Sequence, residues 1–568
     1  MVPGWNADRW VIVGLIVCVV VQVLFVLAFD PFPTVDTAAH LASARGFADV
    51  IGGGSITTSQ FLEWNLVPPP NLFPQLALGA LVPAVGSLWA ERLILVGYVI
   101  VFSFAAGWAV RQAHPGAMLL GFFMLPLTFN LPFLWGFLNF SYSIAGFLLV
   151  AGLLMRWDGR LDLSRMMMLA SAMILVFFTH LVGYLEAGLL AVCILGAACI
   201  LSDNPLVAFT RAAIALAPAV ILTLVFIILT RSEPMSVVFD FGAKLTTLKG
   251  LVSLTAGVAT YDQFERVPCI VTALALWSLV LIAAMRSQLS WMRRPVPLGL
   301  ATFVLLSSGV ALFAPDGMGS GGTLGSIRYV LFPILGAILW LAYQPLPSRV
   351  LLVGATIACL SALSLATIRY DELRAIEVAL QDLRHLESYV SPDSTVVQAN
   401  FRRVKFGSLA RPSSLAAETG RLTAARNAFD LSNVDWSVPF GLLRFRGDTN
   451  PYTHLVQSGK GFFLIESAPP QLEFERFERD TNTLVDYVVV FGRVLPANAT
   501  EVGSRGKSSD IIAQELKRFQ SSLNERYTRV TTSPLGIWEL WSRRPSSANK
   551  RLADCRGHVS DCRRSSGG

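Results

Sequence analysis

The stretch that decides the fold class is WVIVGLIVCVVVQVLFVLAF, residues 10–29, which contains no charged residue. A helix of about 20 apolar residues is long enough to cross the hydrocarbon core of a membrane. The stretch is followed by DPFP, residues 30–33, and not by the small-residue site at which a signal peptide is cleaved. We therefore predict that it is retained as a first membrane span.

The composition of the whole chain is that of a membrane protein with many spans. Its 568 residues are 54% hydrophobic and 15% charged, with a mean hydropathy of +0.57, whereas soluble domains carry about 25% charged residues. Residues 71–86 are apolar but short and interrupted by prolines, so we expect them to be re-entrant or interfacial. The same length criterion predicts about eleven spans, at residues 10–29, 91–110, 116–134, 137–155, 166–183, 184–201, 212–230, 268–285, 297–313, 328–344 and 349–367.

The positions of the arginines predict the orientation of this helix bundle. They lie mostly in connectors between spans and in the last residues, which argues against nucleic acid as a partner despite the formal charge of +7. The connectors near residues 135 and 183 contain no arginine or lysine, so the positive-inside rule places the N-terminus in the cytoplasm. We expect the protein to lie in the cell (inner) membrane. The predicted spans then place residues 29–90, 231–267, 314–327 and everything after residue 367 on the outer face.

The last 200 residues have a different pattern, typical of a small α+β domain. A helix is predicted at residues 372–389, strands at 394–401, 486–494 and 536–544, and a second helix at 509–527. From residue 546 the composition turns to Ser, Arg, Lys and Gly, which is typical of disorder. We therefore predict a mostly α membrane domain at 1–368, an extracytoplasmic α+β domain at 369–545 and a disordered tail at 546–568.

The first outer loop carries the strongest candidate for chemistry, in FDPFPTVDTAAHLASARGF, residues 29–47. Asp36 and His40 are four residues apart in a segment of helical composition, so both lie on one face of a short helix. A carboxylate there can take a proton from a hydroxyl group, with the histidine or a metal ion adjusting its pKa. The alternative is that Asp36 is an ordinary first-turn residue behind a Thr34 cap, and that His40 is structural.

Four cations on the outer loops are candidates for binding a phosphate group. Arg328 follows the glycine-rich segment 317–322 at the mouth of a predicted span, and Lys244, Lys249 and Arg266 lie in the 231–267 loop. The alternative role of each is to anchor the chain at lipid head groups. The segment 317–322, GMGSGG, has the spacing of a dinucleotide-binding loop, but it follows a span and not a strand, so we reject that function.

Two further candidates are polar groups close to predicted span ends. His180 ends one predicted span shortly before Glu186, and ionisable groups at membrane depth often line a cavity. The alternative is that His180 stabilises a tight hairpin by pairing with Glu186 or with the backbone. Glu63 precedes a tryptophan in the first outer loop, a combination that suits contact with a sugar, although the loop could instead be anchored by that tryptophan.

The order of these features resembles the GT-C superfamily, integral-membrane glycosyltransferases that use lipid-phosphate sugars. VDTAAH, residues 35–40, stands where many members have Asp-Glu or Asp-x-Asp, and residues 177–188 and 321–333 are similar to uncharacterised bacterial members. The resemblance implies that Asp36 is the general base in an inverting transfer from a polyprenyl-phosphate sugar to a glycan, lipid or protein acceptor outside the cytoplasm. It implies no cofactor, since the second acid is missing, with a divalent metal as the alternative.

Two other classes of protein fit the same pattern of spans. One is a transporter or flippase of lipid-linked sugars, but no internal repeats are evident and the long loops lie on one side. The other is a membrane scaffold whose outer domain binds polysaccharide.

Overall fold

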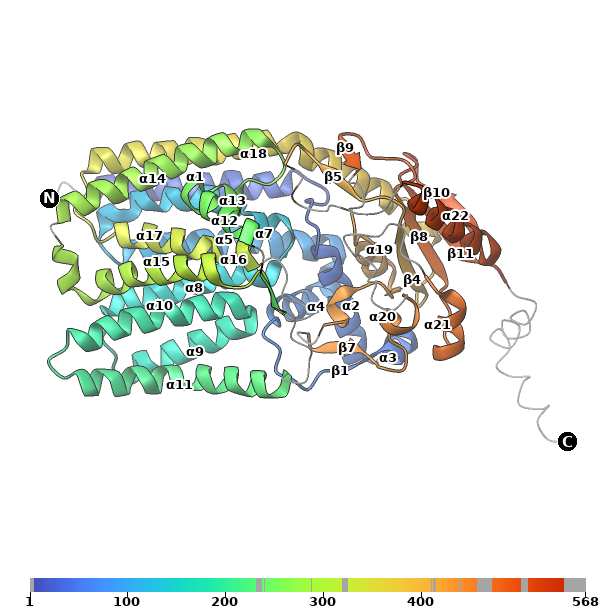
Figure 1. Ribbon diagram of the computed structural model, residues 1–568, viewed down its shortest axis with the longest axis horizontal. Helices are drawn as coiled ribbons and strands as arrows, with labels where there is room; N and C mark the ends of the chain where they lie inside the picture. Colours follow the sequence, from blue (N-terminus) through green and yellow to red (C-terminus); the bar gives the residue numbers. More distant parts are fainter. Residues whose placement is uncertain are drawn as a thin grey trace.

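The computed structural model describes residues 5–230, 237–239, 241–287, 289–318, 325–409, 411, 415–438, 441–456, 472–501 and 509–545. The molecule is elongated, with long helices packed side by side at one end and a smaller domain of helices and strands at the other (Figure 1). The predicted disordered tail and residues 319–322 of the glycine-rich segment lie outside the described residues.

Nine helical stretches among the described residues are long and apolar enough to cross a membrane. One, residues 116–134, is broken, and the others are built on α1 (Trp5–Leu27), α5 (Ser87–Arg111), α8 (Leu138–Trp157), α10 (Leu181–Ile200), α11 (Pro205–Thr230), α14 (Arg266–Ser287), α15 (Pro295–Phe313) and α18 (Ser348–Arg384). Three shorter apolar helices accompany them: α4 (Phe73–Val85), α9 (Leu163–Thr179) and α17 (Leu331–Leu341). The predicted spans at 166–183 and 328–344 correspond to α9 and α17, and the predicted re-entrant segment corresponds to α4.

The broken stretch consists of η1 (Pro115–Met124), α6 (Leu125–Thr128) and α7 (Leu131–Leu134). Asn130 compensates for the break between α6 and α7. Its side chain accepts a hydrogen bond from the Phe133 N–H (2.9 Å) and donates to the Leu127 carbonyl (2.9 Å) and to the Tyr98 hydroxyl (3.1 Å). Such internal partners are required because the membrane interior offers no water. A glycine-containing turn, residues 135–137, follows and approaches the candidate site.

Helix α18 joins the bundle to the C-terminal domain without a linker. Its 37 residues give a length of about 55 Å, and the predicted domain boundary at 368/369 falls inside it. Next to that boundary, Arg369 is fully buried and donates to Glu265 (2.8 Å) and to the Phe129 carbonyl (2.8 Å). The helix is therefore held by a buried ion pair at the level where it leaves the apolar part of the bundle.

The C-terminal domain is built around one five-stranded sheet of order β10-β11-β8-β4-β6. Strand β8 is parallel to β4 and antiparallel to β11, and β4 is parallel to β6. The predicted strands and the second predicted helix are confirmed as β4, β8, β11 and α22. The sheet consists of β4 (Thr395–Asn400), β6 (Phe429–Asp430), β8 (Tyr487–Phe491), β10 (Tyr527–Thr532) and β11 (Trp538–Arg543), accompanied by α19 (Thr419–Arg426), α20 (Pro451–His454), α21 (Phe474–Thr481) and α22 (Ser509–Arg526).

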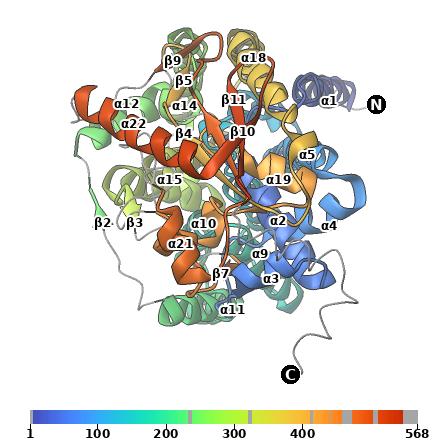
Figure 2. The same cartoon turned by 90° about the vertical axis from the view of Figure 1, so that its right-hand side faces the viewer.

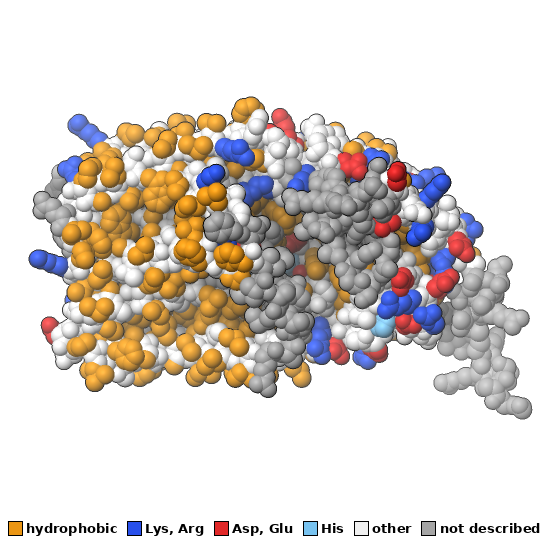
Figure 3. Space-filling model, in the orientation of Figure 1, with side chains coloured by type: hydrophobic (Ala, Val, Ile, Leu, Met, Phe, Trp, Pro, Cys, Tyr) orange, Lys and Arg blue, Asp and Glu red, His pale blue; other side chains and the backbone are white. Residues whose placement is uncertain are grey.

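The long connectors gather at the end of the bundle that carries the C-terminal domain, seen face-on in Figure 2. The first connector contributes α2 (Thr37–Gly52), α3 (Ile56–Phe61) and β1 (Leu62–Trp64), and β1 pairs with β7 (Leu443–Phe445) of the C-terminal domain. The later connectors contribute α12 (Phe241–Ser253), α13 (Thr255–Val258) and α16 (Gly325–Tyr329), and they meet where β2 (Val237–Val238) pairs with β3 (Gly317–Met318). Apolar side chains cover most of the bundle, whereas charged side chains gather on the C-terminal domain (Figure 3).

Candidate active site

The Asp36 carboxylate is half-buried at the start of α2 and is not used to build that helix. Asp36 is the N-cap residue of α2, yet its side chain makes no capping hydrogen bond. Thr34, predicted as the alternative cap, donates instead to the Thr37 hydroxyl (2.7 Å). Within the described part of the chain, no hydrogen bond or ion pair occupies the Asp36 carboxylate. The carboxylate is therefore not committed to a structural contact with those residues.

The position of Asp36 depends on the turn at residues 135–137. The Asp36 N–H donates to the Trp135 carbonyl (2.8 Å). Gly136 has a φ of +83°, and a Cβ atom there would lie 2.7 Å from the Asp36 nitrogen and 2.8 Å from the Thr37 nitrogen. Only glycine fits this backbone conformation and this close approach. The turn after the broken span thus supports the start of α2.

His40 is held by a residue that sequence reasoning missed, Asp435 of η5 (Val434–Trp436) in the C-terminal domain. The His40 Nδ1 atom lies 2.9 Å from Asp435 Oδ2, and the Ser43 hydroxyl donates to the same oxygen (3.0 Å). Asn433 donates to Ser43 (3.0 Å) and to the Ala39 carbonyl (3.1 Å). One loop of the C-terminal domain therefore holds the face of α2 that carries the candidate residues.

These contacts fix the position of His40 and favour its protonated form. Burial by itself lowers the pKa of His40, but the Asp435 carboxylate, its hydrogen bond and the Asp36 carboxylate raise that pKa above its usual value. The pKa of Asp435 is correspondingly lowered: burial opposes ionisation, but the charge of His40 and the hydrogen bonds from His40 and Ser43 outweigh it. Both shifts favour the ionised form of the pair.

Asp36 has the opposite balance. Burial raises its pKa to about 6, the Asp435 charge adds to this, and the charges of His40 and Arg328 lower it in part. The carboxylate is ionised at neutral pH and is a stronger base than an exposed aspartate. That is the property expected of a general base for a hydroxyl group.

Arg328 of α16 supplies a cation beside Asp36. Its guanidinium carbon lies 4.4 Å from the centre of the Phe137 ring, so the turn at residues 135–137 touches both Arg328 and the start of α2. The Nε atom of Arg328 is buried and has no hydrogen-bond partner among the described residues. No carboxylate of those residues lies within 4 Å of the Arg328 guanidinium. The charge of Arg328 acts on both Asp36 and His180. An anion of a substrate would find this group unneutralised.

His180 joins α9 to α10 and is buried. Its Nδ1 atom accepts a hydrogen bond from the Val182 N–H (3.1 Å), which caps α10 and leaves Nε2 as the donor. The ring packs edge-on against Phe140 (5.3 Å between centroids). Glu186 bonds instead to Ser307 (2.8 Å). His180 was predicted to stabilise the hairpin by pairing with Glu186 or with the backbone, and the structure shows the backbone contact. The charge of Arg328 also acts on His180.

The other four candidates are not joined to Asp36 by any contact in the described part of the chain. Glu63 is bound by Arg444 (2.8 Å) in the β1–β7 pair. Lys244 donates to the Ala314 carbonyl (2.6 Å) and to Asp316 (2.9 Å), so it ties α12 to the connector that leads to Arg328. Lys249 and Arg266 are exposed. No group of three or more His, Cys, Asp or Glu side chains in the described ranges is placed to hold a metal ion.

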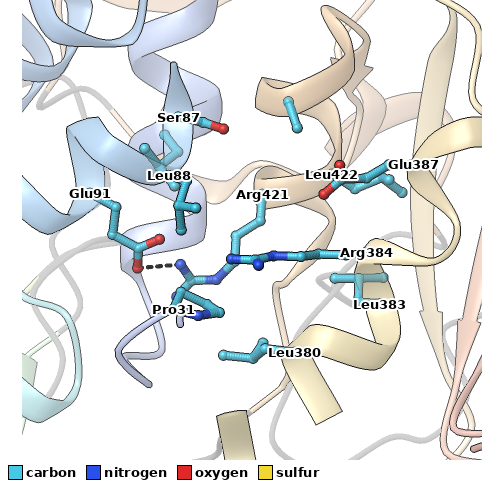
Figure 4. A pocket seen from close by; sticks show the side chains of 12 residues that line it. Pro31, Ser87, Leu88, Glu91, Leu380, Leu383, Arg384, Glu387, Arg421 and Leu422 are labelled. Atoms are coloured by element: carbon cyan, nitrogen blue, oxygen red, sulfur yellow. Dashed lines mark hydrogen bonds and ion pairs between the residues drawn. The ribbon is translucent and has the colours of Figure 1, made fainter. Parts of the chain in front are cut away.

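A cavity of about 210 Å³ lies behind α2, between α5, α18 and α19 (Figure 4). Arg421 of α19 binds Glu91 of α5, marked by the dashed line, as well as Glu418 (2.8 Å) and the Thr34 carbonyl (3.1 Å). Arg384 pairs with Asp30 (2.8 Å). Because its arginines are neutralised by protein groups, this cavity is a structural joint between the bundle and the C-terminal domain.

The residues that sequence reasoning missed are Asp435 and Gly136. The glycine in a proline- and asparagine-rich break was a usable signal, whereas nothing local distinguishes Asp435 from other loop aspartates. No model of a known protein family and no curated protein matches the sequence, so the chemistry of the site rests on its own geometry.

Proposed function

We propose that this chain is an inverting membrane glycosyltransferase that moves a sugar from a polyprenyl-phosphate donor to a hydroxyl-bearing acceptor. The observation that carries the proposal is the closeness of the Asp36 carboxylate to the Arg328 guanidinium, two groups that the described part of the chain leaves without an ionic partner. The site lies where the apolar bundle meets the C-terminal domain, so a lipid carrier in the membrane and an acceptor in water can both reach it.

The proposed reaction is a single displacement. The acceptor oxygen forms a bond to the anomeric carbon as its proton passes to Asp36, and the bond from that carbon to the phosphate oxygen breaks. Polyprenyl phosphate leaves with the electron pair, and Arg328 stabilises the charge that develops on it. The Nε2–H of His180 is a further donor on the side of Arg328. His40, held by Asp435, keeps Asp36 ionised.

The test is incubation of the purified protein with a panel of labelled lipid-phosphate sugars and candidate acceptors. The expected result is transfer by the wild type and a loss of about 10²- to 10⁴-fold in Asp36→Asn, the range for losing a general base. Asp448→Asn, which removes a carboxylate that is 68% exposed, is the matched control and should retain full turnover.

Near-normal turnover by a folded Asp36→Asn protein would discard the assignment. A wild type that moves labelled lipid-linked sugar across a vesicle membrane without transferring it would instead identify the transporter.

A further inference from the structure

A second cavity, of about 560 Å³, lies at the end of the bundle opposite the C-terminal domain. Figure 1 shows this end of the bundle on the left. It is lined by the segment that follows α8, the last turns of α10, the first turns of α11 and the connector into α15. Three arginines from separate segments line it: Arg160 after α8, Arg211 in α11 and Arg293 before α15. Arginines from elements far apart in the sequence thus line the same cavity.

The hydrogen-bonding capacity of these arginines is largely open. Arg211 donates to the Leu161 carbonyl (3.1 Å), and none of the three has a carboxylate within 4 Å in the part of the chain that the structure describes. Asp158 and Asp203 also line the cavity. Three guanidinium groups against two carboxylates leave one excess positive charge, which equals the single negative charge of a phosphodiester.

Beside the polar Ser202 and Asn204, the cavity has an apolar wall, formed by candidate membrane helices and the turn between them. It includes Leu195 of α10, Val207 of α11 and Leu201 between these helices. Val207 and Leu201 are 49% and 42% exposed, respectively. A ligand with an anionic head and a hydrocarbon tail satisfies both walls, whereas a soluble phosphate would leave the apolar wall uncovered.

We propose that this cavity binds the phosphodiester head group of an anionic phospholipid from the leaflet at this end of the bundle. The arginines bind the phosphate oxygens, and the acyl chains run along α10 and α11. Basic pockets between membrane helices are known to select anionic head groups in this way. The site is independent of the glycosyltransferase proposal, because it is at the opposite end of the bundle from Asp36.

The test is native mass spectrometry of the full-length protein in detergent, titrated with phosphatidylglycerol, with phosphatidylcholine and, separately, with inorganic phosphate. Wild type should retain phosphatidylglycerol preferentially. The triple variant Arg160→Gln, Arg211→Gln, Arg293→Gln should bind it at least about tenfold more weakly. The matched control removes three exposed arginines at the same end but outside the cavity, Arg111→Gln, Arg286→Gln and Arg349→Gln, and should retain wild-type binding.

Three results would overturn the proposal. Unchanged lipid binding by the cavity variant would remove these arginines from any lipid site. An equal loss in both variants would mean that general surface charge, and not the cavity, attracts the lipid. Binding of inorganic phosphate without a preference for phosphatidylglycerol would assign the cavity to a soluble anion. A circular dichroism spectrum and a gel-filtration profile matching the wild type establish that each variant is folded.

Discussion

At the residue scale, the candidate site combines a carboxylate that no described residue binds with two basic side chains of different kinds. His40 is bound on its Nδ1 side by Asp435, whereas the Arg328 guanidinium has no anionic partner among the described residues. The first can adjust the pKa of Asp36 without leaving its position, and the second can accept a ligand. The different roles of His40 and Arg328 lead to two predictions.

His40→Gln should shift the pH dependence of transfer. Loss of the imidazolium removes a charge that lowers the pKa of Asp36, while Asp435 remains, so the pKa of Asp36 rises above its value of about 6. A general base must be ionised, and activity is lost as the pH falls through that pKa. The acid limb of kcat/KM against pH should therefore move to higher pH. His454→Gln, a histidine of the C-terminal domain near Asp480 (3.5 Å), should leave the limb in place; an unmoved limb in His40→Gln would show that His40 is only structural.

Arg328→Ala should weaken donor binding. A charge-assisted contact is worth about 1.5–3 kcal/mol, which corresponds to roughly a ten- to hundredfold increase in the donor KM. Arg328→Lys should recover part of this, because it keeps the charge but loses the planar fork. The measurement is donor KM with acceptor in excess, and Arg266→Ala is the exposed control. A donor KM that is unchanged in Arg328→Ala would exclude Arg328 from the donor site.

At the element scale, α2 is held in place by close contact with α19 of the C-terminal domain. A Cβ atom at Gly420 would lie 2.1 Å from the Ala38 carbonyl oxygen. The backbone of α2 therefore packs directly against Gly420 of α19 and leaves no room for a methyl group. Backbone atoms cannot rotate away as a flexible side chain can. The C-terminal domain therefore sets the position of the helix that carries Asp36 and His40.

Gly420→Ala should reduce both stability and turnover. Relief of the clash requires α19 to move away from α2, which costs about 1–3 kcal/mol in overpacked interiors. The measurements are the thermal unfolding midpoint and the rate of transfer. Gly107→Ala in α5 is the matched control, since a Cβ atom there meets nothing within 4 Å. Equal behaviour of the two variants would mean that the α2–α19 contact adapts without consequence.

At the scale of the whole molecule, a buried ionic joint connects the bundle to the C-terminal domain. Arg421 links Glu91 of α5 to Glu418, and the carboxylates of both are almost fully buried. Burial raises the pKa of Glu418 to about 7, even though the charge of Arg421 lowers it in part. The arginine therefore compensates for two carboxylates that water does not reach.

Arg421→Ala should destabilise the protein by about 3–5 kcal/mol, the cost of leaving a buried charge without its partner. Arg444→Ala, which breaks the more exposed pair with Glu63, should cost less than about 1 kcal/mol. A carboxylate with a raised pKa opposes folding as the pH rises, so the deficit of Arg421→Ala should shrink at lower pH as Glu418 is protonated. The measurement is the unfolding midpoint at several pH values between 5 and 8, and a deficit independent of pH would contradict this origin.

The sequence alone determined the features that depend on neighbouring residues. Apolar runs of sufficient length indicated the candidate membrane helices, and the alternation of apolar residues indicated β4, β8 and β11. The spacing of Asp36 and His40 predicted that they lie near each other, and the structure has Asp36 as the N-cap of α2 and His40 in its first turn. These inferences succeeded because helix length, strand alternation and helix breaking are local consequences of the chain's own geometry.

Only the tertiary structure decided which of the candidate residues act together. Asp435 reaches His40 across 395 positions of sequence. Lys244 and Arg328 are cations on neighbouring connectors. Lys244 is paired with Asp316, whereas Arg328 has no anionic partner in the described part of the chain. The continuous helix α18 crosses the expected domain boundary, and just past that boundary Arg369 finds a buried partner in Glu265. Spacing along the chain carries no information about such partners, since each pair is set by the packing of elements that are remote in sequence.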